Sequence, residues 1–427
     1  MNNAAHVSTR LRERYYKIKH ESGLTVLVFP KKLTTFHAIL GVDFGSGDLS
    51  FVQNGKKVML PTGTAHFLEH KLFDSEDGTN SEERFSAMGA EANAYTSYAT
   101  TRYLFSATKC FDECLAELLS MVFNPYFTKE SVQKEKGIIE QEIAMYDDDP
   151  YERVMESCLG AMYSQSGIRE SICGSAESIA KINADVLYQA YSAFYHPQNM
   201  ILSVCGDVTP DQILRTVDRE LGGKSFPVCA SGIPFSEPDR VITQRVEQRM
   251  NVARPIFFMG VKDKIVPTGT ESVRRSLVMT VLNNMLFSGT SELYNRLIDE
   301  RLITPSFSFG YSSGRLGSMN YFSGSSDEPD TVAERLRNEM RDASLGKLSR
   351  DDFVRCRRSL LASYYRAFDS SAVIADDIMY SYVSSNTDPF VVPDIIESIS
   401  FEETADTAAA VFGDPDKIAL SLLLPMS

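Results

Sequence analysis

Two histidines stand four positions apart in the segment TGTAHFLEHKLF, with a glutamate directly before the second. On an α-helix, the side chains of His66, Glu69 and His70 point within an arc of roughly 100°. Two imidazoles one turn apart can bind one divalent ion, and a carboxylate beside them can take a proton from a water at the open position of that ion. The motif therefore predicts metal-dependent hydrolysis, and a peptide bond is the bond that this chemistry suits. The alternative is a chance pairing, expected in on the order of one chain in a hundred or two.

A catalytic zinc ion takes three protein ligands, and the third is expected on another element. A second predicted helix, KEKGIIEQEIAMY, begins with Glu135 as its first carboxylate. Ile138, Ile139 and Glu142 follow it at i+3, i+4 and i+7, so the four residues share one stripe. The two isoleucines predict that this stripe is buried, where a carboxylate is costly unless it meets a cation. Both stripe glutamates are thus candidate functional groups, whereas Glu140 points to solvent; partly exposed salt bridges beside the core are the alternative.

Hydrophobic periodicity gives the elements that must position these residues. The expected elements of the first half are strands at 23–30 and 36–45, helices at 64–73 and 81–89, an antiparallel hairpin of 91–99 and 101–108, helices at 111–121 and 129–145, and a buried strand ending near Gly206. The hairpin follows the two short helices directly. We therefore expect a sheet with helices packed against it.

The segment from 222 to 240 concentrates Gly, Pro and Ser without either period, which predicts a linker. After it the order of elements repeats: PIFFMGVKDK, VMTVLNNMLF, SMNYFSGSS and LSRDDFVRCRRSLLASYY stand where the second strand, the histidine helix, the second hairpin strand and the glutamate helix stood. The pattern predicts an α+β fold of two similar domains, 1–221 and 241–427, each a mainly antiparallel sheet backed by helices. The second domain has no counterpart to the histidines.

Composition narrows the class of protein. The 427 residues are 43% hydrophobic and 23% charged, with a formal net charge of −14, and no run of about eighteen apolar residues predicts a membrane span. The acidic balance argues against nucleic acid as a partner and suits a basic peptide better. The N-terminus carries charges and tyrosines where a secretory signal needs an apolar core, and the seven scattered cysteines suggest reduced thiols, so we expect a cytoplasmic protein.

Four segments together resemble one known family. They are HFLEH at 66–70, GAEANAYTS at 89–97, EKGIIEQEI at 135–143 and FYHPQNMILSVCGDV at 194–208. In order and spacing they resemble the pitrilysin-like inverzincins, which include insulin-degrading enzyme, mitochondrial processing peptidase and many bacterial peptidases. The resemblance implies that His66, His70 and Glu142 bind one Zn²⁺ ion and that Glu69 is the general base. It also implies that Glu135 supports the site without bonding to the ion.

In GAEANAYTS the resemblance implies an edge strand that pairs with the extended backbone of the substrate. Such pairing straightens a peptide through main-chain hydrogen bonds without demanding one sequence. Asn93, Ala94 and Tyr95 are the candidate contacts. For each of them an ordinary sheet strand is the alternative.

Active members of the family carry an arginine and, seven residues later, a tyrosine in the final domain. At these positions this chain has Ile298 and Pro305. The resemblance therefore implies the catalytic subunit of a heterodimer, whose homologous partner lacks the zinc motif and supplies the missing pair, although a homodimer stays open. The other open readings are a non-catalytic structural or peptide-binding subunit and a zinc hydrolase of a non-peptide bond.

Overall fold

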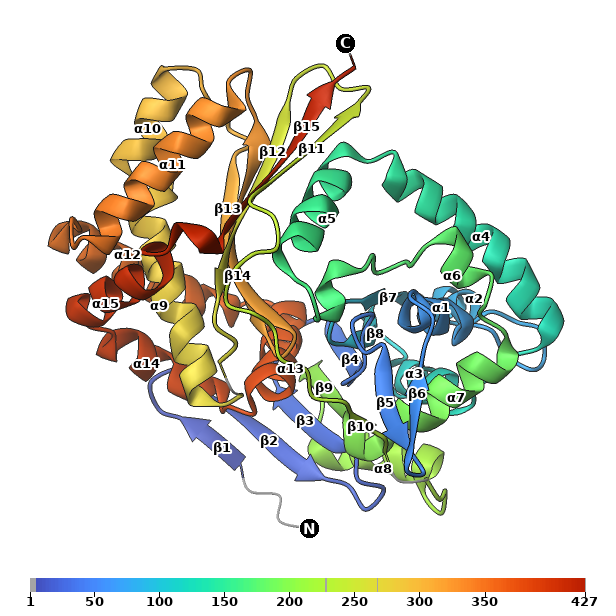
Figure 1. Ribbon diagram of the computed structural model, residues 1–427. Helices are drawn as coiled ribbons and strands as arrows, with labels where there is room; N and C mark the ends of the chain where they lie inside the picture. Colours follow the sequence, from blue (N-terminus) through green and yellow to red (C-terminus); the bar gives the residue numbers. More distant parts are fainter. Residues whose placement is uncertain (1–4, 227–228, 267, 427) are drawn as a thin grey trace.

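The computed structural model describes residues 5–226, 229–266 and 268–426, so parts of both predicted domains and residues 227–228 of the predicted linker lie outside it. Its two main sheets lie in different halves of the chain (Figure 1). In spatial order, the first sheet consists of β1 (Ala5–Ser8), β2 (Glu13–Lys19), β3 (Thr25–Pro30), β9 (Met200–Gly206), β4 (Phe36–Val42), β8 (Thr101–Ala107) and β7 (Glu91–Thr96). The second consists of β11 (Arg245–Met250), β15 (Ile418–Pro425), β12 (Ile256–Asp263), β14 (Gly317–Ser325) and β13 (Ser308–Gly314).

Each main sheet contains one parallel pair, β3 with β9 and β11 with β15, and its other pairs are antiparallel. A small third sheet joins β10 (Ser231–Gly232), β5 (Ser50–Gln53) and β6 (Lys56–Met59). The predicted α+β class, with mainly antiparallel sheets backed by helices, is confirmed. The strands of the seven-stranded sheet all precede residue 222 and those of the five-stranded sheet all follow residue 240, while the exact domain boundaries stay a prediction.

The helices cover both sheets. Those of the first half are α1 (Thr64–Lys71), α2 (Ser81–Ala87), α3 (Phe111–Phe123), α4 (Lys129–Asp147), α5 (Pro150–Met162), α6 (Ala176–Ile179), α7 (Ala184–Phe194) and α8 (Pro210–Leu221). Those of the second half are α9 (Thr270–Phe287), α10 (Glu292–Asp299), α11 (Pro329–Ser344), α12 (Arg350–Ala367), α13 (Ser371–Ser385), α14 (Val392–Ser398) and α15 (Phe401–Phe412). The predicted helices at 64–73, 81–89, 111–121 and 129–145 and the predicted hairpin are confirmed, whereas α5 had no sequence prediction.

Strand alternation gives the seven-stranded sheet two apolar faces. Alternate residues such as Val28 and Leu40 face the main core of the first half, which α1, α3, α7 and α8 complete. The residues between them, such as Phe29 and Ile39, face the other way and pack against Ile374 and other residues of α13. A helix of the second half therefore covers the outer face of the first sheet.

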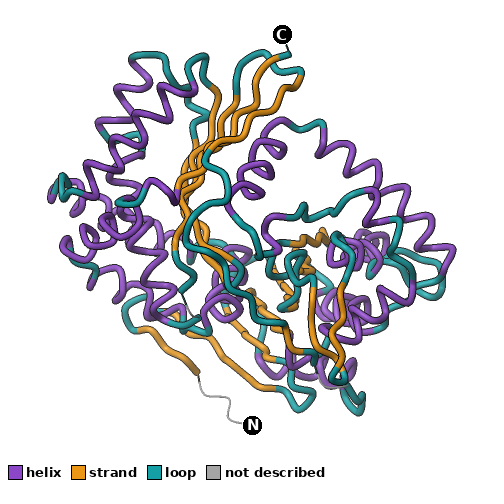
Figure 2. Tube along the Cα trace, viewed as in Figure 1, coloured by secondary structure: helices purple, strands orange, loops and turns teal. Residues whose placement is uncertain are grey.

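The five-stranded sheet is covered in the same reciprocal way. Phe257 and Met259 of β12 face a core with α9, α11, α12 and α15, which lie together on one side of the sheet in Figure 2. Ile256 and Phe258 face the opposite side and pack with Leu159 and its neighbours in α5, a helix of the first half. Each half thus contributes one helix, α13 or α5, that packs on the sheet of the other half. The two halves are therefore joined by apolar contacts.

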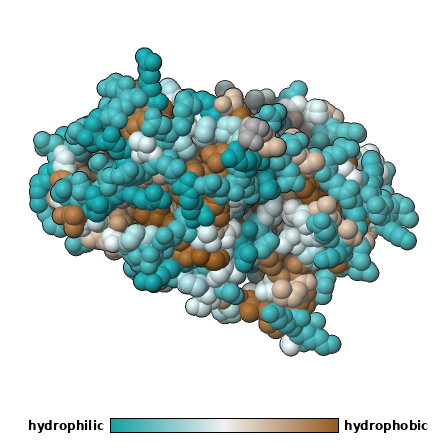
Figure 3. All heavy atoms as spheres, turned by 45° about the horizontal axis from the view of Figure 1, so that its top comes forward, coloured by the Kyte–Doolittle hydropathy of each residue, from teal (hydrophilic) through white to brown (hydrophobic). Residues whose placement is uncertain are grey.

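The surface is mostly polar on the face drawn in Figure 3, where apolar residues form several separate patches between hydrophilic ones. Among the helices of the described residues, none combines the length and apolar composition that a membrane span needs. The seven cysteines all lie within the described residues and are free thiols, as predicted.

A buried ion pair holds the predicted linker against both halves. The carboxylate of Glu237 accepts hydrogen bonds from the backbone N–H groups of Ser164, Gln165 and Ser166 and from Nζ of Lys262, at 2.8–2.9 Å. The side chains of the ion pair are each only 4% exposed. Since a charge left alone in such a place is costly, the pair ties the linker to the end of α5 and to β12.

We predict that Glu237→Ala lowers the free energy of unfolding by about 3–5 kcal/mol, because it leaves the ammonium group of Lys262 buried without its counter-charge. Urea denaturation of the purified protein measures this change. Glu247→Ala, which removes the half-exposed partner of Arg245, is the matched control and should cost no more than about 1 kcal/mol. Equal effects of the two substitutions would contradict the prediction.

Candidate functional site

Close backbone packing fixes the start of the histidine helix α1. Gly63, its N-cap, has φ +84°, and a Cβ atom there would lie 2.4 Å from the carbonyl oxygen of Cys173. Gly174 has φ +76°, and a Cβ atom there would lie 2.6 Å from the carbonyl oxygen of Thr62. Since only glycine tolerates this geometry, the two glycines let the segment 171–174 lie directly against the first turn of α1. As a result, the thiol of Cys173 lies 3.9 Å from Nε2 of His66.

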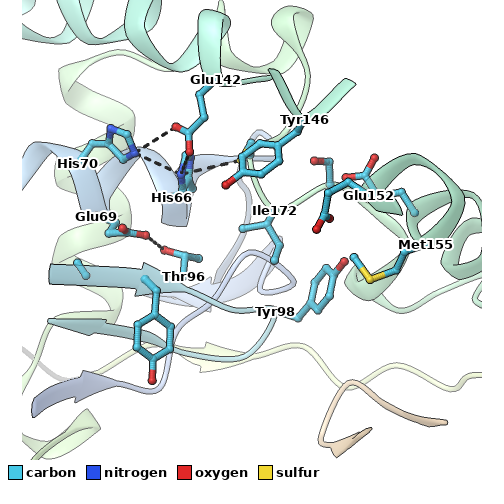
Figure 4. Close-up of a pocket in the computed structure, with 15 residues that line it drawn as sticks. His66, Glu69, His70, Thr96, Tyr98, Glu142, Tyr146, Glu152, Met155 and Ile172 are labelled. Atoms are coloured by element: carbon cyan, nitrogen blue, oxygen red, sulfur yellow. Dashed lines mark hydrogen bonds and ion pairs between the residues drawn. The ribbon is translucent and has the colours of Figure 1, made fainter. Parts of the chain in front are cut away.

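Three donor atoms from two helices converge above α1 (Figure 4). Nε2 of His66 and Nε2 of His70 are 3.2 Å apart, and the carboxylate of Glu142 lies 3.6 Å from the first and 3.4 Å from the second. Ligand atoms placed about 2.0–2.1 Å from a tetrahedral zinc ion would be about 3.3–3.4 Å apart. The two imidazoles and the carboxylate therefore fit one zinc ion, and they are the group of metal-binding side chains found among the described residues.

The imidazole of His70 has a further partner on its other nitrogen. Nδ1 of His70 lies 3.0 Å from Oε1 of Glu135, which leaves Nε2 directed at Glu142. Burial alone lowers the pKa of His70, but the hydrogen bond with Glu135 and the charges of the neighbouring carboxylates outweigh burial and raise it. A hydrogen bond with His66 lowers the pKa of Glu142. The carboxylates thus favour the binding of a cation at this place. Nδ1 of His66 is buried and has no hydrogen-bond partner among the described residues.

Helix α4, which carries both glutamates, lies over the site and is largely exposed. Val132 and Ile139 are its buried residues, and its first turn is fixed by a capping box of Thr128 and Ser131. The prediction that Ile138 is buried beside Ile139 is wrong, because Ile138 is 45% exposed. Only a narrow stripe of this helix contacts the core. Ile138 is about 100° away from Ile139 around the helix axis and therefore lies outside that stripe.

Glu69 lies below the two histidines, with its carboxylate in the pocket. It is 9% exposed, and Oε2 accepts a hydrogen bond of 2.6 Å from the hydroxyl of Thr96, the last residue of β7 (Figure 4). Thr96 lies within the segment GAEANAYTS, and the sequence pattern did not predict it as a site residue. Strand alternation was the available signal, since it places Thr96 on the same face as Ala94, which packs against the core.

The pocket at this site has a volume of about 300 Å³ and is lined by His66, Glu69, His70, Glu142 and residues of β7, α5 and the segment 171–173. Glu152 and Glu156 of α5 belong to its wall, and sequence reasoning missed both. Asp149 accepts from the backbone N–H groups of Tyr151 and Glu152 and so starts α5 immediately after α4. Burial, then the charges of Asp149 and Glu156, raise the pKa of Glu152. The residues that line the pocket include four glutamates and neither lysine nor arginine, so the lining is acidic.

The three candidate substrate contacts lie on β7, the edge strand of the seven-stranded sheet. Ala94 lines the pocket, and the amide oxygen of Asn93 accepts the N–H of Ala94 at 2.8 Å. The hydroxyl of Tyr95 donates to Asp376 of α13 at 3.2 Å and accepts from Arg102 at 2.9 Å. The Tyr95 ring therefore points to the second half. The Tyr95 backbone pairs with Arg102 of β8, whereas the N–H of Ala94 binds the Asn93 side chain and faces the free edge of β7.

The positions of the missing arginine and tyrosine lie in the second half. Ile298 is in α10 and packs against the core of that half, and Pro305 follows in the loop before β13. The nearby Arg296 pairs with Glu292 and Glu339 on the surface. These residues are outside the set that lines the zinc-site pocket.

Comparison with family models identifies two matching segments. Residues 56–176 match the insulinase model, peptidase family M16, and residues 181–360 match the inactive domain of peptidase M16. The first segment contains both histidines of the site and Glu142. The second begins before the predicted linker and covers most of the second half.

Relatives of full length agree with these matches. The chain is 34% identical to the uncharacterized zinc protease YmfH of Bacillus subtilis, over 98% of both chains. A crystal structure of an M16-like peptidase from Alicyclobacillus acidocaldarius has a TM-score of 0.94, with 28% identity over 98% of this chain and 100% of that one. A chain of complex III2 from Candida albicans, 13% identical with a TM-score of 0.75 over 95% of both chains, shares the fold.

We predict that zinc affinity falls as the pH is lowered through neutrality. The raised pKa of His70 means that its ring keeps a proton at higher pH than a free imidazole, and zinc must displace that proton. Calorimetric titration of the metal-free protein in buffers of different ionisation enthalpy measures the proton release. Glu135→Gln removes the charge that raises this pKa, so the proton release should shift to lower pH. Zinc binding without proton release at neutral pH would contradict the prediction.

Proposed function

Because the chain belongs to the insulinase family of zinc proteases, peptidase family M16, we propose that it is a zinc endopeptidase acting on unfolded peptides. The observation that supports this most is the meeting of two imidazoles and one carboxylate at tetrahedral spacing, with a second carboxylate beside them. We assign His66, His70 and Glu142 as the ligands of one zinc ion per chain. The ion, when bound, polarises the scissile carbonyl and makes a water more acidic.

Glu69 is the general base in this proposal. Its buried carboxylate takes a proton from the attacking water and returns it to the nitrogen of the leaving amine, so that the chain has one residue for both transfers. Glu135 acts on the other side of the site, where its hydrogen bond with Nδ1 of His70 orients that ring. The role of Glu135 is therefore positioning.

The peptide is held as an additional strand on the free edge of β7. Main-chain hydrogen bonds at Ala94, with Asn93 and Tyr95 on either side of it, would bind an extended backbone whatever its sequence, which suits unfolded peptides and excludes folded proteins. The hydrogen bond between the Asn93 side chain and the N–H of Ala94 is exchanged when a peptide takes that donor. The acidic wall of Glu152 and Glu156 then favours peptides with a basic side chain near the scissile bond.

A homologous partner completes the catalytic site. Ile298 and Pro305 lack the polar groups of the arginine and tyrosine that the family uses at these positions, and donors aimed at the developing oxyanion contribute several kcal/mol in such reactions. We therefore propose a heterodimer in which this chain supplies the zinc site and its partner supplies the pair. A fully active homodimer of this chain would contradict the partner proposal.

The second candidate is a structural or peptide-binding subunit without catalysis. The likeness of fold to a chain of complex III2 is the observation in its favour. Against it stands the complete set of two histidines and two glutamates, which a purely structural subunit does not need. A protein that neither binds zinc nor cleaves peptides would favour this second candidate.

We predict that the zinc-loaded protein, alone or with its partner, cleaves a mixed peptide pool, as read by mass spectrometry, and that a chelator stops the cleavage. Glu69→Gln should reduce the rate by about 10²–10⁴-fold while zinc content stays unchanged, because the general base is lost and the ligands are kept. The blank is the same protein after chelation. If the zinc-loaded protein left every peptide intact both alone and with its partner, the proposed function would be contradicted.

We also predict a preference for basic peptides. Replacing Glu152 and Glu156 together with glutamine should lower kcat/KM for peptides with lysine or arginine near the scissile bond by about tenfold or more, since a hydrogen bond to a charged group contributes about 1.5–3 kcal/mol. Peptides with norleucine in place of the basic residue should be cleaved as before. Glu140→Gln, on the exposed side of α4, is the matched control. Equal losses for charged and neutral peptides would contradict the preference.

A further inference from the structure

Thr96 connects the edge strand β7, which is proposed to bind the peptide, with Glu69, the proposed general base. It ends β7, the edge strand, and its hydroxyl donates to Oε2 of Glu69 at 2.6 Å. Among the described residues, no other side chain or backbone group forms a hydrogen bond with the Glu69 carboxylate. The orientation of this carboxylate therefore depends on one hydroxyl group of a neighbouring strand (Figure 4).

We propose that Thr96 is a positioning residue that holds the Glu69 carboxylate toward the attacking water, from the same strand on which the peptide docks. The proposal rests on the endopeptidase function given above. It assigns to Thr96 no contact with substrate or metal. Its effect is transmitted through Glu69 alone.

The direction of the hydrogen bond follows from the neighbouring hydroxyl. Thr101 stands directly opposite Thr96 in the β7–β8 pair, with the two Oγ1 atoms 3.4 Å apart. The Thr101 hydroxyl donates to the carbonyl oxygen of Phe44 at 3.0 Å, so its proton is already used. The Thr96 proton is thereby left for the carboxylate, which can only accept. Both residues are β-branched, so their χ1 angles are restricted and the hydroxyl of Thr96 is held in place.

Oε2 is engaged by this bond, and Oε1 is left to act as the base. A carboxylate without a fixed partner can rotate about its terminal torsion, which is broad, so that fewer of its orientations suit proton transfer. A donor on a rigid strand removes this freedom. Removing a group that orients a functional side chain through a hydrogen bond typically lowers activity by about 10- to 100-fold.

The opposite face of β7 is anchored as well. Tyr95, whose side chain points away from that of its neighbour, binds Asp376 of α13 together with Arg102. The strand that is proposed to hold the peptide is thus fixed to the catalytic carboxylate on one face and to the second half of the chain on the other. A peptide that pairs with the edge of β7 therefore binds to the strand that already holds the base.

Three variants of the zinc-loaded protein test the proposal. Thr96→Val removes the hydroxyl at nearly constant shape and should lower kcat by about 10- to 100-fold, with KM and zinc content unchanged. Thr96→Ser keeps the hydroxyl and should retain most of the activity. Thr404→Val removes a buried hydroxyl that donates to the backbone carbonyl of Ser400 in the second half and is the matched control, with kcat near that of the unmodified protein. If the valine variant of Thr96 does not fold, Thr96→Ala replaces it.

A double-mutant cycle separates positioning from a general structural role. In the Glu69→Gln background the proposal expects Thr96→Val to have no further effect on the residual rate, because the base through which it acts is gone. An equal fold-loss in both backgrounds, or a normal kcat in Thr96→Val, would overturn the proposal while leaving the endopeptidase function in place. Failure of the unmodified protein to cleave any peptide, with or without partner, would instead overturn both.

Discussion

The site depends on the electrostatic cost of gathering carboxylates and imidazoles within a few ångströms of one another. Glu142 approaches both Nε2 atoms from the helix above them, and Glu135 reaches the far side of His70. Negative groups concentrated in a part-buried pocket are tolerated when a cation joins them, and a proton on His70 or a metal ion can serve. The rest of the first half holds the two helices that carry these groups at this separation.

That separation depends on packing between the two halves of the chain. Helix α5 follows α4 almost without interruption and is buried against β12 and β15 of the second half, which fixes the far end of α4. In return α13 covers the outer face of the first sheet and reaches Tyr95 through Asp376. The half without histidines therefore supports the site from two sides. This arrangement gives a physical reason why the candidate zinc site depends on the second half of the chain as well as on the first.

The pocket is acidic beyond what the metal requires. Glu152 and Glu156 extend the negative surface away from the histidines along α5, and the formal net charge of the whole chain is −14. A field of one sign in a cleft raises the local concentration of ligands of the opposite sign. In the proposed endopeptidase, backbone pairing on β7 and charge selection on α5 would be separate means of recognition, and only the second would depend on the sequence of the peptide.

The sequence by itself determined the local features. The spacing of His66, Glu69 and His70 required a helix with one chemical face, and the periodicity of apolar residues located the helices and the hairpin, because these patterns depend on residues a few positions apart. Periodicity also indicated Glu135 and Glu142 as candidate site residues. It wrongly predicted that Ile138 is buried, because periodicity identifies the buried face of a helix and not the width of that face. The absence of an arginine and a tyrosine at 298 and 305 could likewise be seen in the letters alone.

Only the tertiary structure decided which distant residues meet. The contacts of Thr96 with Glu69, of Glu152 and Glu156 with the pocket, and of Asp376 with Tyr95 join elements separated by 27 to 281 residues or depend on the angle between two helices. No local pattern encodes such an angle, because the angle results from the packing of the apolar faces of α5 and α13 on the sheets of the opposite halves. The cluster of His66, His70 and Glu142 was therefore predictable from spacing along the chain, and the positions of its supporting groups were decided by packing between distant elements.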